Sequence, residues 1–152
     1  MSAGILPALM SAGFQPAFLF WEGKMNDEEF LKAFQDCTLE EFHHKDHIRM
    51  AWIYLRKFGY EEGSGKVKEG IKKFAAAKNA TTLYHETITE FWIRLVQHVI
   101  ENHPAETFEQ FFASFPPLQD TKSIFLHYTK DFLMSNSARS EWSIPDLLPI
   151  PR

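Results

Sequence analysis

Two segments of this chain repeat apolar residues at helical spacing, and they constrain its fold more than any other feature. Apolar side chains recur every three or four residues from 38 to 58 and again from 81 to 103, which is the period of an amphipathic α-helix. No stretch shows the strict alternation of apolar and polar residues that is typical of a strand. The pattern therefore predicts an all-α fold with these two long helices packed together at its centre.

Shorter patterns predict the other helices and the turns between them. Thr38 and Glu41 have the spacing of a capping box, which predicts the start of the first long helix, and Gly59 predicts its end. Gly63 to Gly65 predict the next turn. Further helices are expected at 26–36, 67–78, 106–115 and 120–134. With 152 residues, 45% of them hydrophobic, the chain can bury its own core, and we expect a single-domain bundle of five to six helices.

The two ends of the chain differ in composition from the helical part. Residues 1–21 carry no charge and contain prolines and glycines, so we expect 1–24 to be a loosely structured arm or extension and 25–152 to be the single helical domain. The arm lacks the basic start of a signal peptide, although a secretion signal is the weaker alternative, and its prolines argue against a membrane span. Spaced prolines and apolar residues from 142 to 151 predict an extended, Pro-rich C-terminal tail across the bundle, anchored by Trp142.

Four of the seven histidines lie on the apolar faces of the two long helices. At about 100° per residue, His43, His44 and His47 fall within the apolar face of the first helix, and His85 falls within that of the second. A buried imidazole costs free energy unless its ring nitrogens have partners, and a metal ion or a polar substrate is a common partner. The placement of these rings therefore indicates a site between the two helices.

The spacing of these histidines suits a metal ion. His43 and His47 are four residues apart, so a helix places one ring above the other, where both could bind one ion. His85 would supply a third ligand, and His44 or Glu86 a fourth. These donors suit one divalent transition metal, namely zinc, iron, copper or nickel. We therefore hypothesise a small metal-dependent enzyme that acts on a small molecule, with Glu86 and His44 as candidate catalytic residues.

Other interpretations stay open at this point, and whether the chain is an enzyme is undecided. Histidine pairs at this spacing also arise by chance, and a histidine on an apolar face is more often a core residue with satisfied hydrogen bonds. The main alternative is a metal-free helical module that binds a small molecule and uses His and Glu as acid-base or hydrogen-bonding groups. A third is a structural or partner-binding bundle, whose tail could pack on a second copy to form a homodimer.

Charge and motif content disfavour several classes of function. The net charge of -4 and the lack of a basic, aromatic-rich face disfavour nucleic-acid binding. The sequence contains no Gly-rich phosphate loop and no Gly-x-Ser-x-Gly motif, which disfavours nucleotide-dependent and serine-hydrolase chemistry. The single cysteine, Cys37, fits a reducing compartment, so we expect a cytoplasmic protein that does not enter a membrane.

Overall fold

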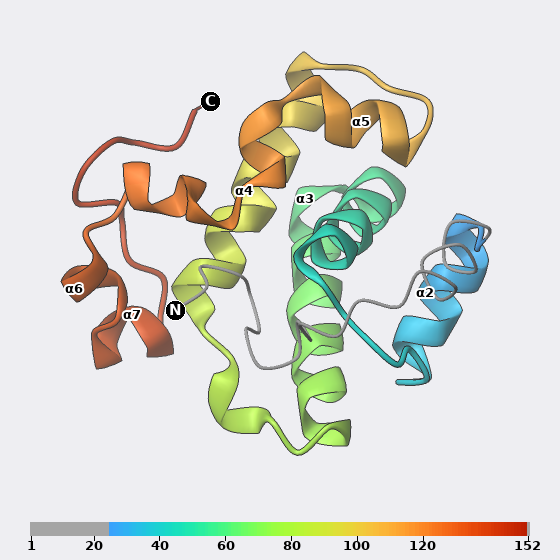
Figure 1. The fold of residues 1–152 in the computed structure, drawn as a ribbon, viewed down its shortest axis with the longest axis horizontal. Coiled ribbons are helices and arrows are strands. Elements are labelled where there is room, and N and C mark those ends of the chain that lie inside the picture. Colours follow the sequence, from blue (N-terminus) through green and yellow to red (C-terminus); the bar gives the residue numbers. More distant parts are fainter. Residues whose placement is uncertain (1–24, 152) are drawn as a thin grey trace.

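The computed structural model describes residues 25–151, which form helices and connecting segments with no strand among them (Figure 1). The all-α expectation is confirmed for this part of the chain, whereas the arm expected at 1–24 lies outside the described residues. None of the helices within the described range combines the length and apolar content needed to cross a lipid bilayer.

Helix α2 (Asp27–Gln35) is the first described helix and matches the one expected at 26–36. Asn26 caps it, because its Oδ1 accepts a hydrogen bond from Glu29 N at 2.8 Å while the Glu29 carboxylate accepts one from Asn26 N at 3.3 Å. Its buried apolar face consists of Phe30, Leu31 and Phe34. Helix α2 packs with this face on α3.

Helix α3 (His44–Ala77) is bent at Gly59, where a φ of 80° and a ψ of 177° interrupt the helical backbone. Gly59 ends the first long helix as expected, but a second helical segment follows at once. The turn expected at 63–65 is wrong, because these residues lie inside that second segment. A Cβ at Gly63 would lie 2.9 Å from Tyr54 O, so glycine lets the two segments approach closely.

The expected start of this helix at Thr38 is also wrong. Thr38 closes α2 instead, since its backbone N–H and its Oγ1 both donate to Ala33 O, at 2.9 and 3.2 Å. Helix α3 begins at His44 after the N-cap residue His43, whose N–H donates to the Asp46 carboxylate at 2.9 Å. The N-cap therefore lies five residues later than the sequence pattern indicates.

Helix α4 (Glu86–Asn102) packs against α3 at the centre of the molecule, as expected for the two long helices (Figure 1). It begins later than expected, because Thr81–Leu83 forms the 3-10 helix η2 and His85 acts as the N-cap. Its inner side buries large side chains, among them Trp92, which is fully buried.

Short helices and the tail follow α4. The helix expected at 106–115 is present as α5. The single helix expected at 120–134 is wrong, because the chain there forms a 3-10 helix followed by one short α-helix. The bounds are α5 (Phe108–Ser114), η3 (Pro116–Gln119), η4 (Thr121–Leu126), α6 (Lys130–Leu133) and α7 (Asn136–Ser140). Because α3 has two segments, the described part of the chain contains seven α-helical segments rather than the expected five to six.

Candidate functional site

His43, the first of the predicted metal ligands, lies at the start of α3 and is partly exposed. Its Nε2 is 2.7 Å from Oε2 of Glu41. Its backbone N–H caps the helix through Asp46. The ring therefore bonds to a neighbouring carboxylate and is only partly buried.

His44 and His47 are both buried in the first turn of α3. Nε2 of His44 lies 2.8 Å from Leu118 O, and because a carbonyl only accepts, this nitrogen carries the proton. Burial lowers the pKa of His44 to about 4, so the ring is neutral at pH 7. His47 packs edge-on against Phe42 with ring centroids 4.0 Å apart, and burial, followed by the nearby His44 and His43, holds its pKa well below 6.5.

These two rings also contain unsatisfied nitrogens. Nδ1 of His44 and both ring nitrogens of His47 are buried without a hydrogen-bond partner among the described residues. Buried polar atoms of this kind are rare, and each calls for an explanation such as a water molecule or a bound group. His47 is thus the one sequence-predicted ligand whose ring nitrogens are all unsatisfied in the described part of the chain.

His85 has both ring nitrogens occupied. Its Nδ1 accepts a hydrogen bond from Ile88 N at 3.2 Å and so caps α4, while Nε2 donates to Leu133 O at 2.7 Å. Burial lowers its pKa, which is consistent with the neutral form that these two bonds require. His85 therefore joins the start of α4 to α6 and has no nitrogen left for a metal.

The described residues do not bring the predicted metal ligands together. Among residues 25–151 no group of three or more His, Cys, Asp or Glu side chains is placed to hold a metal ion. His43, His44 and His47 lie together at the start of α3, whereas His85 is engaged elsewhere. The three-histidine site consequently stays a prediction.

Glu86, the predicted fourth ligand or base, belongs to a network of charges between the second segment of α3 and α4. Its Oε2 is 2.6 Å from Nζ of Lys68, and its Oε1 accepts a hydrogen bond from Tyr84 OH at 2.8 Å. Lys68 also lies 2.6 Å from Oε1 of Glu90. Burial alone would lower the pKa of Lys68, but its bonds to both carboxylates raise it above its usual value.

Glu90 is the centre of this network and is only 4% exposed. Besides Lys68, it accepts hydrogen bonds at Oε2 from Arg94 Nε at 2.7 Å and from the Tyr60 hydroxyl. Burial raises the pKa of a carboxyl group, yet these hydrogen bonds outweigh burial and lower the pKa of Glu90. Burial and the Glu90 carboxylate raise the pKa of Tyr60 to about 12, so the phenol stays protonated and donates.

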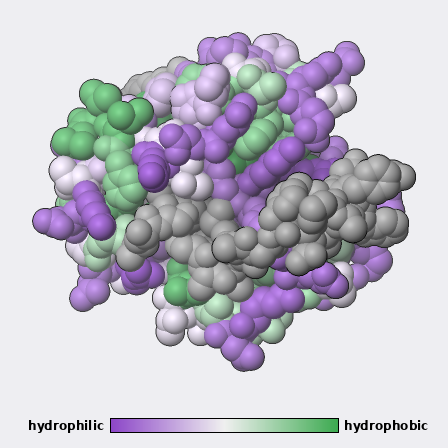
Figure 2. Space-filling model, in the orientation of Figure 1, coloured by the Kyte–Doolittle hydropathy of each residue, from purple (hydrophilic) through white to green (hydrophobic). Residues whose placement is uncertain are grey.

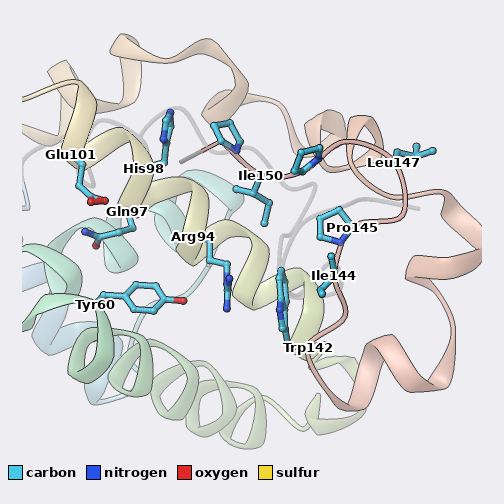
Figure 3. A pocket seen from close by; sticks show the side chains of 12 residues that line it. Tyr60, Arg94, Gln97, His98, Glu101, Trp142, Ile144, Pro145, Leu147 and Ile150 are labelled. Carbon is cyan, nitrogen blue, oxygen red and sulfur yellow. The ribbon is translucent and has the colours of Figure 1, made fainter.

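Next to Glu90 lies a cavity of about 690 Å³ between α4 and the tail, residues 142–151 (Figure 3). One wall consists of Tyr60 and the α4 residues Arg94, Gln97, His98 and Glu101. Their spacing of three, four and seven residues places these α4 side chains on one helix face. The opposite wall is the tail, whose lining residues are mostly proline, isoleucine and leucine. The cavity therefore has one polar and one apolar wall.

Arg94 and Trp142 join the two walls. The Arg94 guanidinium lies 4.3 Å from the centroid of the Trp142 ring, a distance that allows cation–π attraction. Figure 3 shows Arg94 pointing between Tyr60 and Trp142. Trp142 thus contacts α4 at the point where the tail begins.

Hydrogen bonds fix the tail wall at two further positions. Ser143 donates from its backbone N–H to Thr87 Oγ1 at 3.1 Å, and its carbonyl accepts from Tyr128 OH at 2.6 Å. The Asp146 carboxylate accepts two hydrogen bonds from Thr129, one from the hydroxyl at 2.6 Å and one from the backbone N–H at 2.9 Å. The apolar wall is therefore attached to the bundle on both sides of Pro145.

The outer side of the tail is apolar as well. Ile144, Leu147 and Leu148 are exposed. Figure 2 shows an apolar patch at its upper left, where Figure 1 places the tail. The tail therefore presents apolar side chains both to the cavity and to solvent.

The sequence pattern did not predict this cavity, although it contained information about both of its walls. The polar face of α4 could be read from the spacing of its residues, and Trp142 was expected to anchor the tail. The sequence did not predict that Trp142 packs on Arg94. No protein-family model, curated protein or solved structure matches the chain, so the assignment of function rests on this geometry.

Proposed function

We propose that the protein binds a small, largely apolar organic molecule in the cavity between α4 and the tail, using its own side chains for recognition. The observation that carries this proposal is the cavity itself. Its volume of about 690 Å³ falls within the range of roughly 300 to 1,000 Å³ that is typical of small-molecule sites. Such sites combine mostly apolar walls with a few polar groups that orient the ligand.

The polar wall offers groups that would orient such a ligand. Gln97 lines the cavity, and its side-chain oxygen is buried without a hydrogen-bond partner among the described residues. An unsatisfied buried acceptor costs about 1–3 kcal/mol. Rotation of the amide towards the cavity would let a polar group of the ligand relieve this cost.

The apolar wall supports the proposal because it is fixed before any ligand arrives. A tail held by Thr87, Tyr128 and Thr129 loses little conformational entropy on binding, and a preformed site binds more tightly for that reason. Ile144 and Ile150 would cover the apolar body of the ligand.

A neutral fluorescent probe, N-phenylnaphthylamine, tests the proposal directly. The native protein should bind it with a saturable rise in fluorescence. Ile150→Glu places a carboxylate in the apolar wall and should weaken binding about tenfold or more. Ile144→Glu is the second variant, because Ile144 is 76% exposed and tolerates a charge without loss of the fold.

The matched control is Leu148→Glu. Leu148 lies in the same tail and is 57% exposed, but it does not line the cavity, so this variant should bind the probe like the native protein. Absence of probe binding by the native protein, or equal binding by all folded variants, would refute the proposal. Melting curves by circular dichroism identify the variants that are folded.

The metal-dependent enzyme inferred from the sequence stays a prediction beside this proposal. It is favoured only by the unsatisfied ring nitrogens of His44 and His47, and a metal bound there would draw on donors other than His85. The possible homodimer and the cytoplasmic location also stay predictions.

A further inference from the structure

The polar wall of the cavity contains a guanidinium group that is only partly used. Arg94 is the one Lys or Arg side chain among the described residues that line the cavity. Its Nε donates to Glu90, whereas neither of its two terminal nitrogens bonds to another described residue. Its side chain is 43% exposed. These terminal N–H groups therefore form a ready donor edge beside the cavity.

From this edge we infer that the ligand is an organic anion, whose carboxylate or sulfonate binds the two terminal nitrogens of Arg94. This inference rests on the proposed function, because it specifies the chemistry of the molecule in the cavity. The planar fork of a guanidinium matches two anionic oxygens and forms two parallel charge-assisted hydrogen bonds. The apolar body of the ligand would then lie against the tail.

The neighbours of Arg94 hold this fork in place. The Trp142 ring lies against the guanidinium, and Glu90 fixes the Nε edge. Glu90 is itself positioned by Lys68 and by the Tyr60 hydroxyl. A donor edge that is already oriented loses less entropy when an anion binds, so the network acts as a support for Arg94.

The distribution of charge along the cavity orients the ligand. Lys68 pairs with both Glu86 and Glu90, and Glu90 also bonds the Nε of Arg94, so the charges of this network balance while Arg94 remains the one lysine or arginine among the described residues that line the cavity. Glu101, the exposed acid on the same wall, lies seven residues further along α4, about 10 Å away along the helix axis. An anionic group therefore favours the Arg94 end, and the rest of the molecule extends towards Glu101 and the prolines of the tail.

The test compares two probes that differ by one anionic group. Anilinonaphthalenesulfonate carries a sulfonate that N-phenylnaphthylamine lacks, and the native protein should bind it about tenfold more tightly. Arg94→Met should remove this preference, so that the variant binds the two probes with affinities within about twofold of each other. Arg94→Lys keeps the charge without the fork, and should retain only part of the preference.

Arg56→Met is the matched control. Arg56 lies 4.4 Å from the Trp52 ring centroid, a pairing like that of Arg94 with Trp142, but neither residue lines the cavity. This variant should keep the native preference for the sulfonate. If both probes bind the native protein equally, or if Arg94→Met keeps the preference, the inference of an anion is overturned while the cavity remains a binding site. If neither probe binds, the proposed function fails with it.

Discussion

His47 is buried where its ring nitrogens have no hydrogen-bond partner among residues 25–151, so the side chain destabilises the folded state. Its exposure is 0% and both nitrogens are unsatisfied, while leucine has a similar volume and no polar atom. His47→Leu should therefore raise the free energy of unfolding by about 1–3 kcal/mol, measured by urea denaturation at pH 7.5.

His85→Leu is the opposing control for that substitution. Here the ring caps α4 through Ile88 N and bonds to Leu133 O, so its loss should lower the free energy of unfolding by about 1–3 kcal/mol. If His47→Leu destabilises the protein as much as His85→Leu does, His47 has a partner such as a water molecule or a metal ion. That result would contradict the cost assigned to His47 and favour the metal hypothesis.

The same residues show what could and could not be predicted at this scale. Burial of His44, His47 and His85 followed from their place on apolar faces, and the structure bears it out. The partners could not be predicted, because Leu118 O is 74 residues from His44 and Leu133 O is 48 residues from His85. Every residue has a backbone carbonyl, so the sequence does not indicate which carbonyl will accept a hydrogen bond from a histidine. A second histidine, by contrast, can be identified in the sequence as a possible partner.

At the scale of an element, the bend of α3 depends on how closely its two segments approach. A Cβ at Gly63 would lie 2.9 Å from Tyr54 O and 3.0 Å from Leu55 Cα. These are backbone atoms that cannot rotate away, so Gly63→Ala should lower the free energy of unfolding by about 1–3 kcal/mol.

Gly65→Ala is the matched control in the same helical segment. A Cβ there would meet nothing within 4 Å, and alanine favours a helix over glycine by up to about 1 kcal/mol. Gly65→Ala should therefore stabilise the protein slightly in the same denaturation experiment. Similar effects of the two substitutions would show that close approach at Gly63 is not what requires glycine.

This pair also explains why the helix boundaries were predicted poorly. A Gly-Ser-Gly run normally marks a turn, but here tertiary packing requires a small residue at Gly63 and overrides the local preference. Similarly, Thr38 and Glu41 have the spacing of a capping box, yet the Thr38 hydroxyl bonds back to Ala33. The local pattern located the helices and the bend at Gly59, but it did not predict that α3 begins at His44 or that residues 63–65 are helical.

At the scale of the whole molecule, the cavity exists because the end of the chain returns to α4. Trp142 lies on Arg94, 48 residues earlier in the chain, and Ser143 bonds to Thr87. The helical face that forms the polar wall was open to prediction from its periodicity. The packing of the tail on that face could not be predicted, because a proline-rich segment without a repeat does not indicate which of its residues will contact which helix.

The core as a whole keeps its buried histidines neutral, which makes the stability of the fold dependent on pH. His44, His47 and His85 all have lowered pKa values, mainly because burial disfavours the charged ring. Above the unfolded-state value of 6.5, both states are neutral and stability is complete. Below 6.5 the unfolded chain binds protons that the folded chain does not, so stability falls as the pH is lowered.

Urea denaturation at pH 7.5 and at pH 5.5 should show this loss. His44, with a folded-state pKa of about 4, should alone lower the free energy of unfolding by about 1.4 kcal/mol over this interval, and His47 and His85 act in the same direction. The pKa of Glu90 is lowered from 4.5, so Glu90 stays ionised in both states throughout the interval and adds no slope. His47→Leu should lose less stability than the native protein between the two pH values. Equal stability of the native protein at pH 7.5 and 5.5 would mean that these rings are not held neutral by the core.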